Sequence, residues 1–251
     1  MSEALFIPYV ASPLPAPARA VLVVAPHPDD EVFGCGGACA LYAKAGVPVR
    51  ALILTDGGLW GEPPAGVSIV QARADEARRA AAVLGCGTPD FAGFADRSLA
   101  EASGLPQLIA QHAQRLGADV VLAPSPWEIH PDHRAAAAAA IEAIAQLGEG
   151  HTLVQYEVGA TLLANVLVDI TPAWRLKQQA MASFQSQLAM QRYDRHVEAL
   201  NVFRTYTLPP HVQVAEAFRV AAPQVAAGDP FGLVQSGHRH PVAGAGAKAV
   251  R

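Results

Sequence analysis

Two short segments of the chain place histidine and carboxylate side chains close together. The first is Pro26-His27-Pro28-Asp29-Asp30-Glu31, and the second is His130-Pro131-Asp132-His133. His27 and Asp30 are three residues apart, so an imidazole and a carboxylate can point at one ion. A catalytic zinc ion usually takes three protein ligands and leaves one position open for water. We therefore predict a divalent-metal site in which His133 completes the set begun by His27 and Asp30.

The other polar residues of these segments suit hydrolysis. Asp29 projects in a different direction from Asp30, so it is free to take a proton from a water whose pKa the metal lowers toward about 7. His130, three residues before His133, is placed to stabilise an oxyanion or to protonate a leaving amine. Asp132 is a candidate to orient one of the histidines without binding the metal itself.

The predicted elements bring these segments to one edge of a sheet. Short apolar runs such as Val21–Ala25 are typical of strands buried on both faces, and helical patterns separate them. This alternation predicts a Rossmann-like, doubly wound α/β domain with a mostly parallel sheet and helices on both faces. Ligands of such sheets bind beyond the carboxyl ends of the strands. The predicted strands are 21–25, 49–55, 90–94, 119–123, 152–158, 165–170 and an edge strand at 212–220; the predicted helices are 36–45, 71–84, 105–116, 134–147 and 171–190.

Composition limits the classes of function. The chain has 251 residues, of which 51% are hydrophobic and 16% charged, which excludes a disordered protein. No apolar stretch reaches the roughly 18 residues of a membrane span. A net charge of −4 without a run of Lys or Arg argues against nucleic-acid binding. Residues 1–18 lack the basic start of a secretory signal, so we expect a cytoplasmic protein with one catalytic domain, 1–220, and a Gly/Pro/Ala-rich tail, 221–251.

Both segments resemble the motifs of one known family. A strand followed by Pro-His-Pro-Asp-Asp-Glu and a Gly-rich helix start, with His-Pro-Asp-His later in the chain, is similar to the PIG-L/LmbE-like zinc-dependent N-deacetylases. Members remove acetyl groups from N-acetylglucosamine units of glycolipid, thiol-cofactor, antibiotic and polysaccharide precursors. The resemblance covers about residues 20–220. Its weaker matches are Arg73, Glu76, Asp96, Tyr156-Glu157, Asp169-Ile170-Thr171, Lys177 and Ser186-Gln187.

The resemblance implies roles for particular residues. It assigns the metal to His27, Asp30 and His133, with Asp29 as the base and His130 as the acid that stabilises the oxyanion. Two further residues, Arg73 and Asp96, match positions that bind the sugar in some relatives. The alternatives are a surface ion pair for Arg73 and an ordinary loop acid for Asp96.

The chain departs from the family pattern beside the second motif. Some relatives carry a tyrosine where this chain has Glu128, which is either a solvated loop charge or a hydrogen-bond partner of a substrate hydroxyl. Its neighbour Trp127 either stacks on a sugar face or packs under the loop. The Gly/Pro-rich stretch that follows Asp56 is a candidate lid or specificity loop, taken as residues 56–68.

Together these observations predict a metal-dependent hydrolase that removes an N-acetyl or other N-acyl group from an amino sugar. The expected metal is Zn²⁺, with Fe²⁺ or another divalent ion as the alternative. The expected partner is a small molecule or glycoconjugate precursor, and a homo-oligomer is compatible with the sequence. Two rival functions stay open. A non-haem iron enzyme would use the same two histidines and one carboxylate, and a sugar-binding module would not catalyse at all.

Overall fold

A seven-stranded sheet forms the centre of the computed structural model, which describes residues 8–221. The strand order is β3-β2-β1-β4-β5-β7-β6, and β7 alone runs against its neighbours β5 and β6. The predicted doubly wound, mostly parallel architecture is therefore confirmed. The strands are β1 Val21–Ala25, β2 Val49–Thr55, β3 Asp90–Phe94, β4 Val120–Pro124, β5 Thr152–Tyr156, β6 Val166–Asp169 and β7 Ala215–Ala221.

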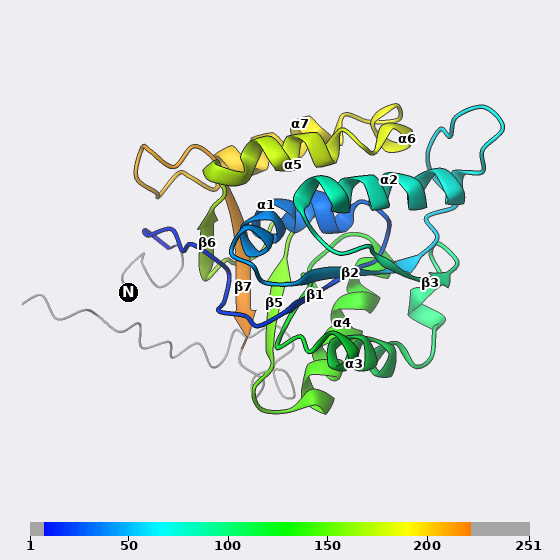
Figure 1. The fold of residues 1–251 in the computed structure, drawn as a ribbon, viewed down its shortest axis with the longest axis horizontal. Coiled ribbons are helices and arrows are strands. Elements are labelled where there is room, and N and C mark those ends of the chain that lie inside the picture. Colours follow the sequence, from blue (N-terminus) through cyan, green and yellow to red (C-terminus); the bar gives the residue numbers. More distant parts are fainter. Residues whose placement is uncertain (1–7, 222–251) are drawn as a thin grey trace, which may run out of the picture.

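Helices cover both faces of this sheet (Figure 1). Every residue of β1 is buried, and successive residues of a strand face opposite sides. Val21 and Val23 accordingly belong to the core beneath α1, α2 and α5, whereas Leu22 and Val24 belong to the core beneath α3 and α4. The helices are α1 Asp30–Lys44, α2 Ile69–Leu84, α3 Leu105–Leu116, α4 Pro131–Leu147, α5 Trp174–Met181, α6 Gln185–Leu188 and α7 Tyr193–Phe203. None of these helices, within residues 8–221, is both long and apolar enough to span a bilayer.

The topology of the sheet changes direction between β1 and β4. The chain first builds outward from β1 through β2 to β3, and then returns so that β4 pairs with the other side of β1. The crevice outside such a switch point is the usual ligand site of an open α/β sheet. The two polar motifs follow β1 and β4, so this switch point brings them together.

Helix α1 begins earlier than predicted. The expected helix at 36–45 starts instead at Asp30, and the α1 backbone is non-helical at Cys35. The carboxylate of Glu216 in β7 accepts the N–H groups of Gly37 and Ala38 at 2.8 Å each, so it caps the second half of the broken helix. Lys177 pairs with the same carboxylate at 2.7 Å. The predicted start at 36 corresponds to the second half of this helix, after the break at Cys35, and the first half was not predicted.

The C-terminal third also differs from the prediction. The single helix expected at 171–190 is interrupted: a 3₁₀ turn at Thr171–Ala173 leads into α5, and α6 follows after a break. Helix α7 was not predicted. The strand expected at a sheet edge is β7, which instead pairs with strands on both sides and leaves β6 at the edge. The predicted tail at 221–251 lies outside the described residues, apart from Ala221 in β7.

Candidate active site

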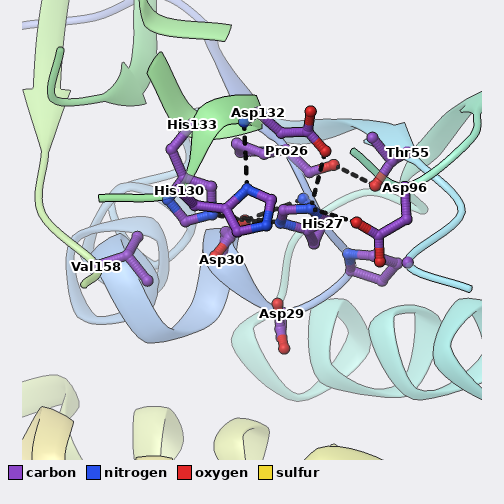
Figure 2. A network of polar contacts seen from close by, with 12 residues as sticks. Pro26, His27, Asp29, Asp30, Thr55, Asp96, His130, Asp132, His133 and Val158 are labelled. Carbon is purple, nitrogen blue, oxygen red and sulfur yellow. Dashed lines mark hydrogen bonds and ion pairs between the residues drawn. The ribbon is translucent and has the colours of Figure 1, made fainter. Parts of the chain in front are cut away.

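Three side-chain atoms from the two motifs converge at the β1–β4 edge. His27 follows β1, Asp30 begins α1, and His133 lies in the first turn of α4. The Oδ2 atom of Asp30 lies 3.3 Å from Nδ1 of His27 and 3.1 Å from Nε2 of His133. The two ring nitrogens are 3.3 Å apart (Figure 2). A tetrahedral zinc ion with bonds of about 2.0–2.1 Å separates its ligand atoms by about 3.3–3.4 Å, so these three atoms fit such an ion.

The charges around these atoms favour a cation. Burial alone would lower the pKa of His27, but hydrogen bonds with Asp132, Asp30 and Asp96 raise it to about 11. Burial likewise opposes charging of His133, yet the Asp30 carboxylate, with Glu128 adding to its effect, raises the pKa of His133 to about 9. The same contacts hold the pKa of Asp30 below its ordinary value despite burial. Metal binding displaces protons from its ligands, so a divalent ion would occupy a pocket that already attracts positive charge.

The outer nitrogen of His27 faces two carboxylates. Its Nε2 lies 3.3 Å from Oδ2 of Asp132 and 3.3 Å from Oδ1 of Asp96. Asp132 is fixed in turn by the N–H groups of Arg97 at 2.7 Å and Leu99 at 3.1 Å. The structure thus places Asp132, from the second motif, against the histidine of the first motif. A carboxylate on the outer nitrogen leaves the inner nitrogen of the ring available to a metal.

Asp29 lies beside the three converging atoms in a strained backbone conformation, on the side that faces α2 (Figure 2). Its φ of 152° is rare for a residue other than glycine, and such conformations cost about 1–3 kcal/mol. Its N–H donates to Oε2 of Glu31 at 3.0 Å, and its Oδ2 accepts from Arg73 at 3.0 Å. Burial raises the pKa of Asp29 to about 6, and the Arg73 charge opposes that rise.

Arg73 is buried, with 3% of its surface exposed. Besides Asp29, its guanidinium donates to the carbonyl oxygens of Pro28 at 3.1 Å and Gly57 at 3.0 Å. The alternative of a surface ion pair is therefore wrong. In this structure the guanidinium joins the β1–α1 turn to the start of the 56–68 loop.

His130 is both the cap of α4 and a neighbour of the two converging histidines. Its Nδ1 accepts the N–H of Asp132 at 3.2 Å, and its ring centroid lies 4.6 Å from that of His27 and 5.3 Å from that of His133. Burial and the positive charges of His27 and His133 lower the pKa of His130, so its ring is neutral near pH 7. Because Nδ1 is the acceptor, the hydrogen-bond network assigns the ring proton to Nε2.

Glu128 is the site residue whose role the sequence reasoning missed. It is 2% exposed, so the interpretation as a solvated loop charge was wrong. Its Oε1 accepts the N–H of Val158 at 2.7 Å, and its Oε2 lies 3.4 Å from Nδ1 of His133. The sequence shows a glutamate two residues before His130, but nothing in it indicates that the side chain turns inward. Trp127, its neighbour, is half-buried.

The 56–68 loop is tied to the site along one side. The N–H of Leu59 donates to Asp96 at 3.3 Å, and the carbonyl of Trp60 accepts from the side chain of Gln187 at 3.0 Å. Ser186, next to Gln187, is held by the Glu76 carboxylate at 2.6 Å. The side chains of Leu59 and Trp60 are exposed. The loop thus exposes two apolar side chains to solvent, and its backbone contacts Asp96, which in turn contacts His27.

Comparisons with known proteins agree with the motif resemblance. The family model for GlcNAc-PI de-N-acetylase, PIG-L, matches residues 22–144. A protein of Bacillus anthracis named as a probable N-acetyl-alpha-D-glucosaminyl L-malate deacetylase 2 is 30% identical over 189 residues, 68% of this chain and 82% of that protein. N,N′-diacetylchitobiose deacetylase from Pyrococcus horikoshii superposes with a TM-score of 0.75 at 26% identity, covering 85% of this chain and 88% of that one.

A structural neighbour with another activity also matches. The 4-carboxy-2-hydroxymuconate hydratase from Pseudomonas putida has a TM-score of 0.65 at 25% identity, covering 82% of this chain and 97% of that one. One fold can support different reactions, so the chemistry has to be argued from the side chains at the site.

Proposed function

This chain belongs to the PIG-L family of de-N-acetylases, and from that premise we propose that it is a metal-dependent hydrolase that removes an N-acetyl group from an amino sugar. The observation that carries the proposal is the convergence of His27, Asp30 and His133 beside a carboxylate, Asp29, that is outside the ligand set. A small molecule or a glycoconjugate precursor is the proposed substrate class, and the cytoplasmic location stays a prediction.

The metal would be held by Nδ1 of His27, Oδ2 of Asp30 and Nε2 of His133. Zn²⁺ is our proposal, because two imidazoles and one carboxylate with an open fourth position are a usual catalytic zinc set; Fe²⁺ is the alternative. When bound, such an ion polarises the acetyl carbonyl and lowers the pKa of water toward about 7.

Asp29 is the proposed general base. Its burial favours the protonated form, and the Arg73 charge favours the carboxylate, so this side chain can accept and then release a proton near neutral pH. The hydrogen bonds from Arg73 to the carboxylate and from the Asp29 backbone to Glu31 hold the base in place. Asp29 would take the proton of the attacking water as the amide carbon becomes tetrahedral.

His130 is the proposed electrophilic group. Its neutral ring carries the proton on Nε2, so it can donate a hydrogen bond to the oxygen on which negative charge develops. Collapse of the tetrahedral carbon breaks the C–N bond, and the departing nitrogen needs a proton. Asp29, which has just gained one, is the proposed donor, because a neutral His130 ring that gave up its Nε2 proton would become an imidazolate.

For the sugar, we propose that Trp127 offers a stacking face and that Arg73 and Asp96 line the amino-sugar side of the pocket. Asp96 contacts His27, so a substrate hydroxyl bound by Asp96 would lie next to the reacting groups. Arg73 is buried and donates to Asp29, so it would act on the sugar side through the position of Asp29. The exposed side chains of Leu59 and Trp60 are further candidates to contact the sugar, because the N–H of Leu59 donates to Asp96 at 3.3 Å.

The test combines elemental analysis of the purified protein with amine-release assays on a panel of N-acetylglucosaminides. We expect about one divalent ion per chain and release of acetate with a free amine from at least one member of the panel. Bound metal without amine release, but with oxygen consumption or hydration of an unsaturated carboxylate, would assign the site to an iron enzyme or a hydratase. A protein that binds no metal when supplied with Zn²⁺ or Fe²⁺ contradicts the proposal.

A further inference from the structure

Glu128 connects a loop to the second histidine of the site. It lies in the turn between β4 and α4, five residues before His133. Its carboxylate faces the backbone that follows β5, where it accepts N–H groups from three consecutive residues. These donors are Val158 at 2.7 Å, Gly159 at 3.0 Å and Ala160 at 3.4 Å. Three backbone donors around one carboxylate fix both its position and its negative charge.

The imidazole of His133 needs such a partner on its outer side. Its Nε2 points to Asp30 and to the facing nitrogen of His27. Its Nδ1 is buried and, among residues 8–221, has no aligned hydrogen-bond partner. The Oε2 atom of Glu128 lies 3.4 Å away, within ion-pair distance. A nitrogen that binds a metal must be unprotonated, so the proton of a neutral ring has to reside on Nδ1, opposite Glu128.

From this geometry we propose that Glu128 is a positioning residue that holds the proton of His133 on Nδ1 and thereby presents Nε2 to the metal. The inference rests on the proposed ligand role of His133. Glu128 would serve His133 as Asp132 serves His27, and each carboxylate is anchored by backbone N–H groups. The difference is that Glu128 is anchored to the loop at 158–160, so the position of that loop is coupled to the ligand.

The variant Glu128→Gln tests this role, because an amide keeps the shape and its one oxygen can still accept the N–H groups of Val158 and Ala160, but it carries no charge. Removing a carboxylate that supports a metal-bound histidine typically weakens metal affinity by about 10–100-fold. We expect a loss of that size in Zn²⁺ affinity, measured by competition with a chromophoric chelator. Activity of the loaded enzyme is not needed for this measurement.

Glu157→Gln is the matched control. Glu157 is also buried and also serves the segment after β5, where its carboxylate accepts the N–H of Leu162 at 3.0 Å and pairs with Arg204. Within residues 8–221, Glu157 forms no hydrogen bond or ion pair with His133. If Glu128 acted only by holding the loop, both variants would weaken Zn²⁺ binding alike; we expect Glu157→Gln to stay near the wild-type affinity.

A second readout uses the unmodified protein. ¹⁵N NMR of the histidine rings in the zinc-loaded wild type distinguishes a proton on Nδ1 of His133 from one on Nε2, and we expect Nδ1. A folded Glu128→Gln variant with wild-type Zn²⁺ affinity overturns the inference while leaving the proposed function intact. A proton on Nε2 would remove His133 from the proposed ligand set, and the inference with it. Failure of the wild type to bind metal instead removes the proposed function, and this inference with it.

Discussion

The guanidinium of Arg73 donates a 3.0 Å hydrogen bond to the carboxylate of Asp29, across 44 positions of sequence. This contact lowers the pKa of a carboxyl group that burial alone would raise further. The same guanidinium donates to two carbonyl groups, those of Gly57 and Pro28. Arg73 therefore controls the charge of the proposed base and also the position of the turn that carries it.

Arg73→Lys is predicted to reduce turnover while leaving the protein folded. A single ammonium group cannot reproduce the planar fork that holds Asp29, Pro28 and Gly57 together. Misplacement of a catalytic group by about 1 Å can cost about 100-fold in rate, so we expect a decrease in kcat of about 10–100-fold. Steady-state kinetics would measure it, with Arg79→Lys, an exposed arginine of the same helix, as the control. An unchanged kcat in Arg73→Lys would show that the contact is dispensable.

Asp29→Asn is predicted to abolish most of the activity without removing the metal. Asparagine cannot take a proton from water, and loss of a general base typically costs about 10²–10⁴-fold in rate. Elemental analysis should find the wild-type metal content, because Asp29 is outside the proposed ligand set. Asp75→Asn, half-exposed on α2, should leave both measurements unchanged. Wild-type turnover in Asp29→Asn on every accepted substrate contradicts the mechanism.

Two substitutions of His130 separate its chemical role from its structural one. Asparagine is a good helix N-cap, so His130→Asn should keep the stability of α4 but remove the donor on Nε2. Loss of one oxyanion donor costs about 10²–10³-fold in kcat. His130→Ala should show a similar kinetic loss together with about 1 kcal/mol lower free energy of unfolding. Denaturant titration and kinetics on both variants test this, and equal activity of His130→Asn and wild type would exclude His130 from the reaction.

Asp119→Asn is predicted to make the free energy of unfolding less dependent on pH in the acid range. Asp119 precedes β4, and Arg19 lies just before β1. The carboxylate of Asp119 accepts hydrogen bonds from the backbone N–H of Arg19 at 2.8 Å and from its side-chain Nε at 2.9 Å. Burial tends to raise the pKa of Asp119, but these hydrogen bonds lower it on balance. A depressed folded-state pKa stabilises the fold above the unfolded value of about 3.9 and ceases to do so as pH falls through the folded value.

The stability difference between wild type and Asp119→Asn should therefore be full at pH 7 and should shrink as the pH is lowered below about 4. Unfolding free energies from urea titrations over this range measure it. Asp90→Asn, whose side chain is 41% exposed, is a suitable comparison. A difference that stays constant down to the lowest pH at which the protein folds would show that the charge of Asp119 does not contribute.

The sequence predicted those elements whose signals are local. The strands at 21–25, 49–55 and 90–94 and the helix at 105–116 have the predicted bounds. The first two of these strands are mostly apolar and buried, and Gly117 ends the helix. The prediction that the last strand lies at the edge of the sheet was wrong, since β7 lies between β5 and β6. Strand order depends on contacts between distant segments, which leave no local pattern in the sequence. The break between α5 and α6 had no comparable signal either.

The site shows the same division. The two motifs indicated that His27, Asp30 and His133 would lie close together, because each motif follows a strand that ends at the same edge of the sheet. The contacts of Arg73 with Asp29, and of Glu128 with the loop at 158–160, join elements that are far apart in sequence. Their side chains carry no local pattern that indicates an inward direction, so only the structure reveals these partners.

The carboxylate of Glu216 joins a helix of the active site to a strand that is synthesised much later. Every residue proposed to bind the metal or to take a proton lies at or before position 133. The helix that begins with Asp30, however, is capped at its break by Glu216, near the end of the described chain. A nascent polypeptide thus carries all the reactive groups for some eighty residues of translation before it gains β7, the strand whose Glu216 caps the helix that begins with Asp30. A chain truncated before β7 should retain both motifs and yet lack a stable site.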